Sequence, residues 1–306
     1  MNPARCHTTE SPPSTDGRII AAFGRQYLVE MPDGAVLSCV IRGKKGGSVC
    51  GDRVSVQSVA AGQGVIEATL PRSSLLYRSD ASRQKLIAAN VTQVILVIAA
   101  IPGFSEELIN RCLAAVEEQG IRAIIVLNKT DLVEPARKAM TSLRLYQELD
   151  YPVICLSALN DISPLLPYLQ NQLSVLVGQS GMGKSTLVNA LVPEARRTTA
   201  DISVALDTGR HTTTHARLYQ IDRHSHIIDS PGLQEFGLHH LSEAQLAWGF
   251  VEFHTYIGQC RFSNCRHVNE PGCAIEQAAT EEKISVKRLS SYRHLMTSHA
   301  SSAHRK

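Results

Sequence analysis

The chain has 306 residues, of which 43% are hydrophobic and 19% are charged, and this balance excludes a disordered or collagen-like chain. About 150 residues per domain predicts roughly two domains. The longest apolar run, Val94–Ile101, is much shorter than the roughly 20 residues of a membrane-spanning helix, and the first residues form no targeting pattern. We therefore expect a cytoplasmic protein without membrane contact.

The net charge of +3 is the sum of three unequal parts. Residues 1–90 carry 11 Lys and Arg against 7 Asp and Glu, residues 91–245 carry 12 against 16, and residues 246–306 carry 8 against 5. Two basic flanks thus enclose an acidic centre. Basic flanks favour a polyanionic partner such as nucleic acid, although excesses of this size also occur on ordinary solvated surfaces.

Residues 17–70 contain five short apolar segments separated by turns, which predicts a small all-β barrel or sandwich. These segments are 18–23, 27–31, 35–41, 53–59 and 64–68. The glycine-rich turn 42–47 carries Lys44 and Lys45, which suit an RNA-binding surface and equally a solvated turn. Residues 71–90 are polar and basic, and we interpret them as a linker.

From Val91 onwards, near-continuous apolar strands alternate with helices, which predicts a doubly wound α/β domain over residues 91–245. The expected strands are 91–100, 123–127, 153–156, 173–177 and 225–228. Ser105 is expected to cap a helix that Gly120 ends.

A phosphate-binding loop follows the expected strand 173–177 and precedes a helix expected at 186–191. The loop consists of Gly178, Gln179, Ser180, Gly181, Met182, Gly183, Lys184, Ser185 and Thr186. Backbone N–H groups of such a loop converge on phosphate oxygens, Lys184 reaches the β- and γ-phosphates, and the Ser185 hydroxyl ligates Mg²⁺. The alternative is a glycine-rich turn without a ligand, which this position between strand and helix disfavours.

Two polar motifs that follow neighbouring strands indicate a guanine site. They are Asn128, Lys129, Thr130 and Asp131 after strand 123–127, and Ser157 and Ala158 after strand 153–156. A carboxylate at Asp131 accepts the ring N–H and the 2-amino group of guanine, whereas adenine lacks that amine. Such a mismatch discriminates by ~10⁴ to 10⁵, so the motif predicts GTP rather than ATP. The Ala158 segment would direct a backbone N–H at guanine O6.

The segment from Asp229 to Gly232 indicates a loop that distinguishes GTP from GDP. Asp229 can hold a Mg²⁺-bound water, and the N–H of Gly232 can meet the γ-phosphate. Upstream, the run Thr212–Thr214 offers a hydroxyl to complete the Mg²⁺ shell, and we favour Thr213 as that ligand.

Four metal-ligand candidates crowd into one short segment of the C-terminal module, residues 246–300: Cys260, Cys265, His267 and Cys273. Three thiolates and one imidazole match a closed structural zinc site, and zinc would stabilise a segment with few large apolar side chains. A redox pair and a catalytic zinc site are the alternatives, which the cysteine spacing and the four protein ligands disfavour. We treat His254 as an ordinary residue.

The last expected helix spans residues 281–296. Its periodicity predicts an inward face and a charged outer face. The inward residues would be Val286, Leu289, Tyr292 and Met296, and the outward ones Lys283, Lys287 and Arg288.

The order of the nucleotide motifs is rotated, because the base-binding residues precede the phosphate loop and the loop at Asp229 follows it. This order resembles that of circularly permuted GTPases. With a small barrel in front and a Cys/His cluster behind, residues 17–296 resemble the ribosome small subunit-dependent GTPase A (RsgA) family. Further matching segments are 51–54, 70–73, 88–91 and 209–214. Because the permutation joins the loop at Asp229 directly to the C-terminal module, GTP hydrolysis is expected to move that module.

The resemblance implies a circularly permuted P-loop GTPase domain between an RNA-binding OB-fold barrel and a mostly helical zinc-binding domain. It implies that the small (30S) ribosomal subunit and its 16S-type rRNA stimulate GTP hydrolysis during late subunit maturation, and we expect a monomer. Leu233 stands where Ras-like GTPases carry a water-orienting Gln. The resemblance points instead to His211 as catalytic together with Lys184, and a solvent-facing loop residue is the alternative for His211. An RNA chaperone that uses nucleotide only for stability and a large-subunit assembly GTPase are the rival functions.

Overall fold

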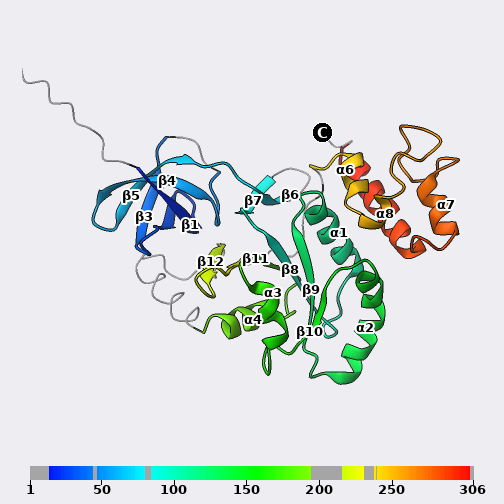
Figure 1. The fold of residues 1–306 in the computed structure, drawn as a ribbon, viewed down its shortest axis with the longest axis horizontal. Coiled ribbons are helices and arrows are strands. Elements are labelled where there is room, and N and C mark those ends of the chain that lie inside the picture. Colours follow the sequence, from blue (N-terminus) through cyan, green and yellow to red (C-terminus); the bar gives the residue numbers. More distant parts are fainter. Residues whose placement is uncertain are drawn as a thin grey trace, which may run out of the picture.

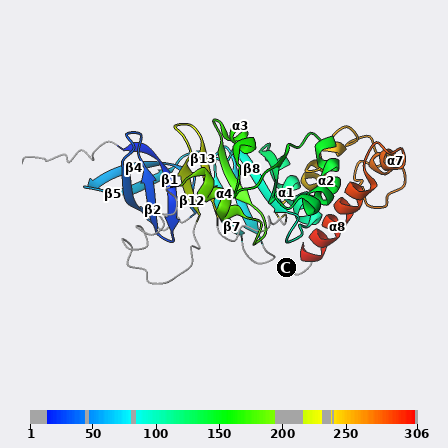
Figure 2. The ribbon, with the colours of Figure 1, turned by 90° about the horizontal axis from the view of Figure 1, so that it is seen from below.

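The computed structural model describes residues 14–43, 47–79, 84–193, 216–230, 238 and 240–303. Three parts follow one another along the long axis of the molecule (Figure 1): a β-barrel, an α/β domain and a helical C-terminal part. The view from below keeps this order (Figure 2). The barrel and the C-terminal part thus lie on opposite sides of the α/β domain.

The N-terminal part is a closed barrel. Its strands are β1 (Thr15–Phe23), β2 (Gln26–Glu30), β3 (Val36–Ile41), β4 (Arg53–Ala60) and β5 (Gln63–Thr69). They pair in the order β1–β2–β3–β5–β4, and β4 pairs back onto β1. Alternate residues point inwards, among them Ile19, Val29 and Ile66, which are fully buried. This closed five-stranded arrangement confirms the expected all-β barrel and fits an OB-fold.

Residues 71–90, which we interpreted as a linker, contain a hairpin of β6 (Leu75–Ser79) and β7 (Gln84–Ala89). A buried ion pair ties the start of this segment to the barrel. The fully buried Asp52 accepts hydrogen bonds from Nε of Arg72 at 2.7 Å and from its Nη2 at 2.8 Å. The Asn90 side chain donates to the Gly51 carbonyl at 3.0 Å. Three of the segments that carry the family resemblance therefore meet at this joint.

The central part is a doubly wound α/β domain, as predicted. Its elements are β8 (Gln93–Ala99), α1 (Glu106–Glu117), β9 (Arg122–Asn128), α2 (Val133–Glu148), β10 (Val153–Cys155), the 3-10 helix η1 (Ser163–Leu165), α3 (Leu166–Leu169), β11 (Leu173–Val177), α4 (Lys184–Leu191), β12 (Arg217–Gln220) and β13 (His226–Asp229). The strands lie in the order β10–β9–β8–β11–β13–β12, and all but β12 are parallel. The side chain of Ser105 caps α1 by accepting from the Leu108 N–H.

Helices cover both faces of this sheet. Along β8, Val94 and Leu96 belong to the core beneath α1 and α2, whereas Ile95 and Val97 belong to the core beneath α3 and α4. Because the parallel strands run in one direction, their carboxyl ends meet at one edge of the sheet, where ligands of α/β proteins bind. The phosphate loop follows β11 at this edge, and the base-binding motif follows β9.

The barrel and the central domain share one eleven-stranded sheet. Strand β12, the last strand of the central domain, pairs with β13 on one side and with β1 of the barrel on the other, where Ala21 faces Arg217. Next to this pairing, Nη1 of Arg18 on β1 lies 3.4 Å from Nε2 of His226 on β13. Burial lowers the pKa of His226, and the Arg18 cation lowers it further.

The C-terminal part is mostly helical. Its elements are α6 (Glu243–Trp248), the 3-10 helix η2 (Val251–Phe253), α7 (Ala274–Thr280) and α8 (Val286–Ala303). The expected start of the last helix at residue 281 was wrong, because α8 begins at Val286. Glu282 has a φ of +58°, and the Lys283 N–H bonds to the Ala278 carbonyl, which ends α7 and delays α8. In the ranges that the structure describes, no helix is both long and apolar enough to span a membrane.

The faces of α8 differ in part from the prediction. Leu289, Tyr292 and Met296 are buried as expected, but Val286 is 69% exposed. Arg288, which we expected to face outwards, is 1% exposed. A charged residue is buried at such a position only where partners satisfy its donors.

Arg288 fixes α8 onto the central domain. Its Nε and Nη2 donate to Glu252 at 2.6 Å and 3.1 Å, and its Nη1 donates to Oδ1 of Asn110 on α1 at 2.6 Å. The guanidinium lies over the Phe250 ring, 4.4 Å from its centre. Asn110 also accepts from the Tyr146 hydroxyl on α2 at 2.9 Å. The partners of Arg288 come from distant segments, so helix periodicity could not reveal its burial.

We expect Arg288→Met to lower the free energy of unfolding by about 3–5 kcal/mol, because the Glu252 carboxylate would stay buried without its cation. Chemical denaturation followed by circular dichroism measures this loss. Lys287→Met is the matched control, since Lys287 is the neighbouring residue on α8 and its side chain is 57% exposed in a pair with Glu106. The control should cost at most about 1 kcal/mol. Equal losses in the two variants would contradict the role of Arg288.

Candidate nucleotide site and metal centre

The phosphate loop passes so close to its neighbours that two of its glycines admit no side chain. Gly178 has a φ of +148°, and a Cβ there would lie 2.2 Å from the Val97 carbonyl oxygen. Gly183 has a φ of +92°, and its Cβ would lie 2.2 Å from Nδ2 of Asn128. Both positions require glycine for conformation and for space. The loop is therefore held against β8 and against the base-binding motif.

Lys184 begins α4 with its ammonium group directed back over the loop. Its Nζ donates to the carbonyls of Gly178 at 2.5 Å and Gln179 at 2.8 Å. Burial lowers the pKa of Lys184, and the nearby Asp229 carboxylate partly offsets this decrease. Burial raises the pKa of Asp229, and the Lys184 cation partly offsets this increase. The two groups thus share one partly buried region at the carboxyl ends of β11 and β13.

The remaining loop residues differ in exposure. Ser180, Gly181 and Ser185 are exposed, and Met182 is buried against the sheet. With exposed residues above a buried anchor, the loop leaves its outer side open to a polyphosphate.

The Asn128 side chain connects three of the predicted motifs. Its Nδ2 donates to the Met182 carbonyl of the phosphate loop at 2.9 Å. Its Oδ1 accepts from the Ala158 N–H, also at 2.9 Å. Ser157 is buried beside it, and the N–H of Thr130 bonds to the Leu156 carbonyl at 3.2 Å. One buried amide thereby sets the spacing between the phosphate loop and the two base-binding motifs.

Lys129 and Asp131 lie on either side of Thr130 with different environments. Lys129 has a φ of +63°, and its Nζ donates to the Ile101 carbonyl at 2.9 Å. Asp131 is exposed, so its carboxylate is open to a ligand. The loop after β8, which includes Ile101 and Pro102, was not predicted as part of the site. The Pro102 ring would lie 3.4 Å from a Cβ at Gly181, and the Pro102-Gly103 dipeptide after a strand is the sequence signal for such a loop.

The structure places Asp229 at the end of β13, and Thr186 lies in the first turn of α4. Three other predicted site residues lie outside the described residues: His211, Thr213 and Gly232. Lys44 and Lys45 of the barrel turn also lie outside them.

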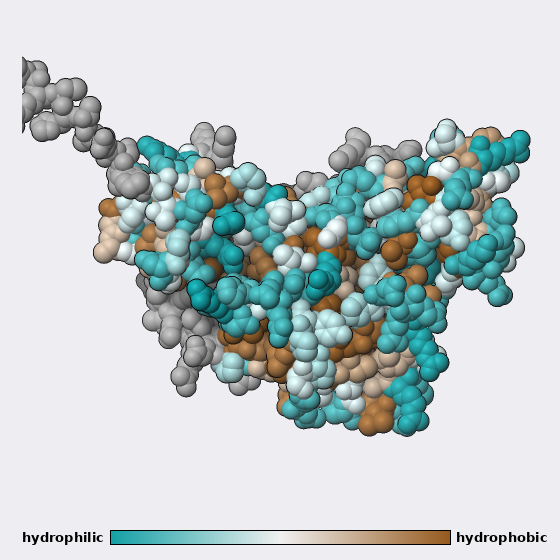
Figure 3. Space-filling model, viewed as in Figure 1, coloured by the Kyte–Doolittle hydropathy of each residue, from teal (hydrophilic) through white to brown (hydrophobic). Residues whose placement is uncertain are grey.

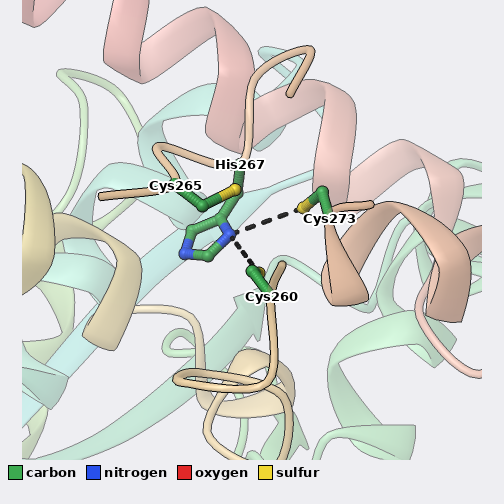
Figure 4. A group of neighbouring side chains, drawn as sticks. All are labelled: Cys260, Cys265, His267 and Cys273. Carbon is green, nitrogen blue, oxygen red and sulfur yellow. Dashed lines mark hydrogen bonds between the residues drawn. The ribbon is translucent and has the colours of Figure 1, made fainter. Parts of the chain in front are cut away.

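The four predicted metal ligands, Cys260, Cys265, His267 and Cys273, come together in space (Figure 4). All their donor atoms lie within 4.8 Å of one another. Nδ1 of His267 is 3.5 Å from the sulfur of Cys260 and 3.5 Å from that of Cys273. Sulfur and nitrogen ligands of a tetrahedral zinc ion are also about 3.5 Å apart, given bonds of about 2.3 Å and 2.1 Å. The cluster therefore fits one four-coordinate ion.

Neighbouring groups hold the ligand loop in shape. One oxygen of Glu270 accepts the N–H of Val268 at 2.9 Å, and the other accepts the N–H of Arg266 at 3.2 Å, so the carboxylate brackets His267. The Tyr292 hydroxyl on α8 donates to the Arg266 carbonyl at 2.8 Å. The N–H of Ala274 bonds to the Cys260 sulfur at 3.3 Å, which ties this ligand to the first residue of α7.

His254 is not among the clustered ligands, and no disulfide joins the described cysteines. The seven cysteines that the structure describes are all free. His254 stacks on Trp248 with ring centres 3.9 Å apart, and its Nε2 lies 2.6 Å from the Trp248 carbonyl oxygen. His254 is therefore engaged elsewhere, as expected.

Comparison with known proteins decides the family. The model of the family described as RsgA GTPase matches residues 69–239, more than half of the chain. The chain belongs to the RsgA GTPase family. It is 61% identical over 297 residues to the Small ribosomal subunit biogenesis GTPase RsgA of Nitrosospira multiformis, an alignment that covers 97% of this chain and 94% of the relative. The protein of the same name from Nitrosomonas europaea is 53% identical, with 92% and 91% covered.

Solved structures agree with this RsgA assignment. The crystal structure of YjeQ from Thermotoga maritima matches with a TM-score of 0.75 and 30% identity, covering 94% of this chain and 99% of that one. YloQ, described as a circularly permuted GTPase, matches with a TM-score of 0.73 and 27% identity, covering 97% and 98%. The expected circularly permuted GTPase fold with its N-terminal barrel and C-terminal Cys/His cluster is thereby confirmed.

Proposed function

We propose that this RsgA family member is a GTP hydrolase that binds the small (30S) ribosomal subunit through its 16S-type rRNA. Hydrolysis would time its release during late subunit maturation in the cytoplasm, and it would act as a monomer. The observation that carries the nucleotide part is the Asn128 amide, which joins the phosphate loop to the Ala158 segment. The relatives named small ribosomal subunit biogenesis GTPase support the choice of partner.

Each part of the site has a distinct role in this proposal. The exposed Asp131 accepts the two N–H donors of guanine, and the Ala158 segment faces the base. Lys184 turns from the loop carbonyls towards the β- and γ-phosphates. Asp229 and the Gly232 N–H respond to the γ-phosphate. Ser185, at the start of α4, and Thr213 are the proposed Mg²⁺ ligands, and Mg²⁺ bound with GTP neutralises charge on the phosphate oxygens.

The C-terminal cluster is proposed to hold one structural zinc ion through Cys260, Cys265, His267 and Cys273. All four coordination positions would be filled by protein, so the ion would stabilise the fold rather than take part in hydrolysis. The ion would shape the ligand loop on the side of the molecule that faces away from the barrel (Figure 1).

His211 is proposed to orient the attacking water, because Leu233 lacks a group that could do so. We expect His211→Ala to lower subunit-stimulated turnover by about 10²-fold while the affinity for GTP stays unchanged. Single-turnover hydrolysis with small subunits, together with nucleotide titration, measures both quantities. His224→Ala, which replaces an exposed histidine of the turn between β12 and β13, is the matched control. Unchanged turnover in His211→Ala would exclude the role.

The decisive experiment for the function is a GTPase assay with each purified ribosomal subunit, with ATP as competitor. Stimulation by the small subunit, its absence with the large subunit and its loss in Lys184→Ala would support the proposal. Stimulation by the large subunit would favour a large-subunit assembly factor. RNA binding without any stimulated turnover would favour a chaperone that uses nucleotide only for stability.

A further inference from the structure

The tip of the metal-ligand loop presents an aromatic ring to solvent. Phe262 lies between the ligands Cys260 and Cys265 and is 43% exposed. Its carbonyl accepts the N–H of Cys265 at 3.2 Å, so the turn between the two ligands fixes its backbone. Its neighbours Ser263 and Asn264 are exposed and polar. The ring is thus displayed on a short rigid turn rather than buried in a core.

The Arg261 guanidinium lies over this ring, 5.4 Å from its centre. The backbone of Arg261 is also fixed, because its N–H bonds to the Gly272 carbonyl at 3.0 Å. A Cβ at Gly272 would lie 2.9 Å from Cβ of Arg261 and 3.3 Å from its Cδ. Only glycine at position 272 therefore lets the Arg261 stem pack flat and carry its cation over Phe262. We call Arg261 and Phe262 the tip platform.

The charge of the tip platform is uncompensated. The neighbouring Arg266 pairs with Glu243 at 2.6 Å. For Arg261, no carboxylate partner is found within the described part of the chain. The face of the C-terminal part seen in Figure 3 is mainly hydrophilic, with scattered hydrophobic residues, which does not resemble an apolar protein-binding patch. A flat ring with a free cation over one of its faces suits a polyanion that carries aromatic bases.

We infer that the tip platform binds an unpaired RNA base, with the base stacked on Phe262 and Arg261 contacting the adjacent phosphate. This inference rests on the proposed function, since rRNA is the RNA that the protein would meet on the small subunit. Stacking on an aromatic ring is the common means of holding single-stranded RNA, and an arginine adds a cation–π and a phosphate contact. The metal-bound turn contributes by holding the ring in place before RNA arrives.

The test uses the full-length, metal-loaded protein and a single-stranded RNA oligonucleotide that contains 2-aminopurine, whose fluorescence is quenched on stacking. Phe262→Leu keeps an apolar side chain but removes the flat ring, and it should weaken RNA binding about 5- to 100-fold and abolish the quenching. Phe262→Trp keeps a flat ring and should bind like the wild type. Arg261→Gln should weaken binding and reduce its salt dependence. Val286→Ala, at an exposed apolar residue of the same module, is the control.

Sedimentation with purified small subunits forms the second arm. Weaker association of Phe262→Leu in both arms, with its metal content unchanged, would support the inference. Unchanged RNA binding of Phe262→Leu would overturn the inference. A variant that loses subunit binding but keeps RNA binding would also overturn it, because that result would indicate a ribosomal protein as the partner. Failure of the wild-type protein to bind small subunits would count against the proposed function instead, because stacking on the oligonucleotide is measured separately.

Discussion

Cys273→Ser is expected to release the bound metal and to unfold the C-terminal part while the barrel and the central domain stay folded. Cys273 is buried at the start of α7, and its sulfur lies 3.5 Å from Nδ1 of His267. Zinc binding contributes about 10–16 kcal/mol to folding of small zinc domains, far more than a single hydrogen bond. The zinc contribution has to outweigh an apolar core in which Phe250, Phe253 and Tyr292 pack with Leu246 and Ile275, and which is continuous with the core of the central domain.

The loss of metal is measured as metal content per chain, and the unfolding is measured by hydrogen exchange over residues 246–303. Cys155→Ser is the matched control, because Cys155 is exposed and lies outside the cluster. The control should retain its metal and its full protection from exchange. A Cys273→Ser protein that keeps one zinc ion and the protection of the wild type would show that the cluster is not a structural zinc site.

Asp131→Asn is expected to reduce the affinity for GDP and GTP by about 10²- to 10⁴-fold. The change removes two charge-assisted hydrogen bonds of about 1.5–3 kcal/mol each and turns an amide donor towards the donors of guanine. Asp131 is exposed, so the substitution leaves the packing of the domain intact. Xanthine carries a carbonyl oxygen in place of the 2-amino group, and the variant should therefore prefer xanthine nucleotides.

Equilibrium titration with GDP, its xanthine counterpart and ADP measures the base preference. Asp150→Asn is a suitable control, because Asp150 is exposed at the end of α2 and its φ of +62° is one that Asn tolerates. The control should bind guanine nucleotides like the wild type. If Asp131→Asn did so too, the base would have to be recognised elsewhere.

The local elements of this fold could be predicted because their signals are local. The short apolar segments separated by turns predicted the barrel strands, and Ser105 predicted the start of α1. The four metal ligands lie within one short segment, so their spacing alone predicted their meeting. The phosphate loop could be predicted because its glycines are required by close backbone contacts, as at Gly178.

Features that depend on distant segments could not be predicted in the same way. The burial of Arg288 requires Asn110 and Glu252, which lie 178 and 36 residues away. The role of Asn128 in joining two loops follows from the strand order, because Met182 and Ala158 reach it only at the edge of the folded sheet. The hairpin at 75–89 escaped prediction because the arginines and polar residues of this segment drew attention away from its two short apolar runs, in which Leu76 and Ala88 are buried.

The pairing of β1 with β12 has a mechanical consequence. A force applied to the barrel, for instance by a large particle to which it is attached, passes through backbone hydrogen bonds to β12 and from there to β13. β13 ends at Asp229, whose neighbour across the site is Lys184. Tension or torque on the barrel therefore needs to cross only two strand pairings to displace the residues that we propose as contacts of the terminal phosphate.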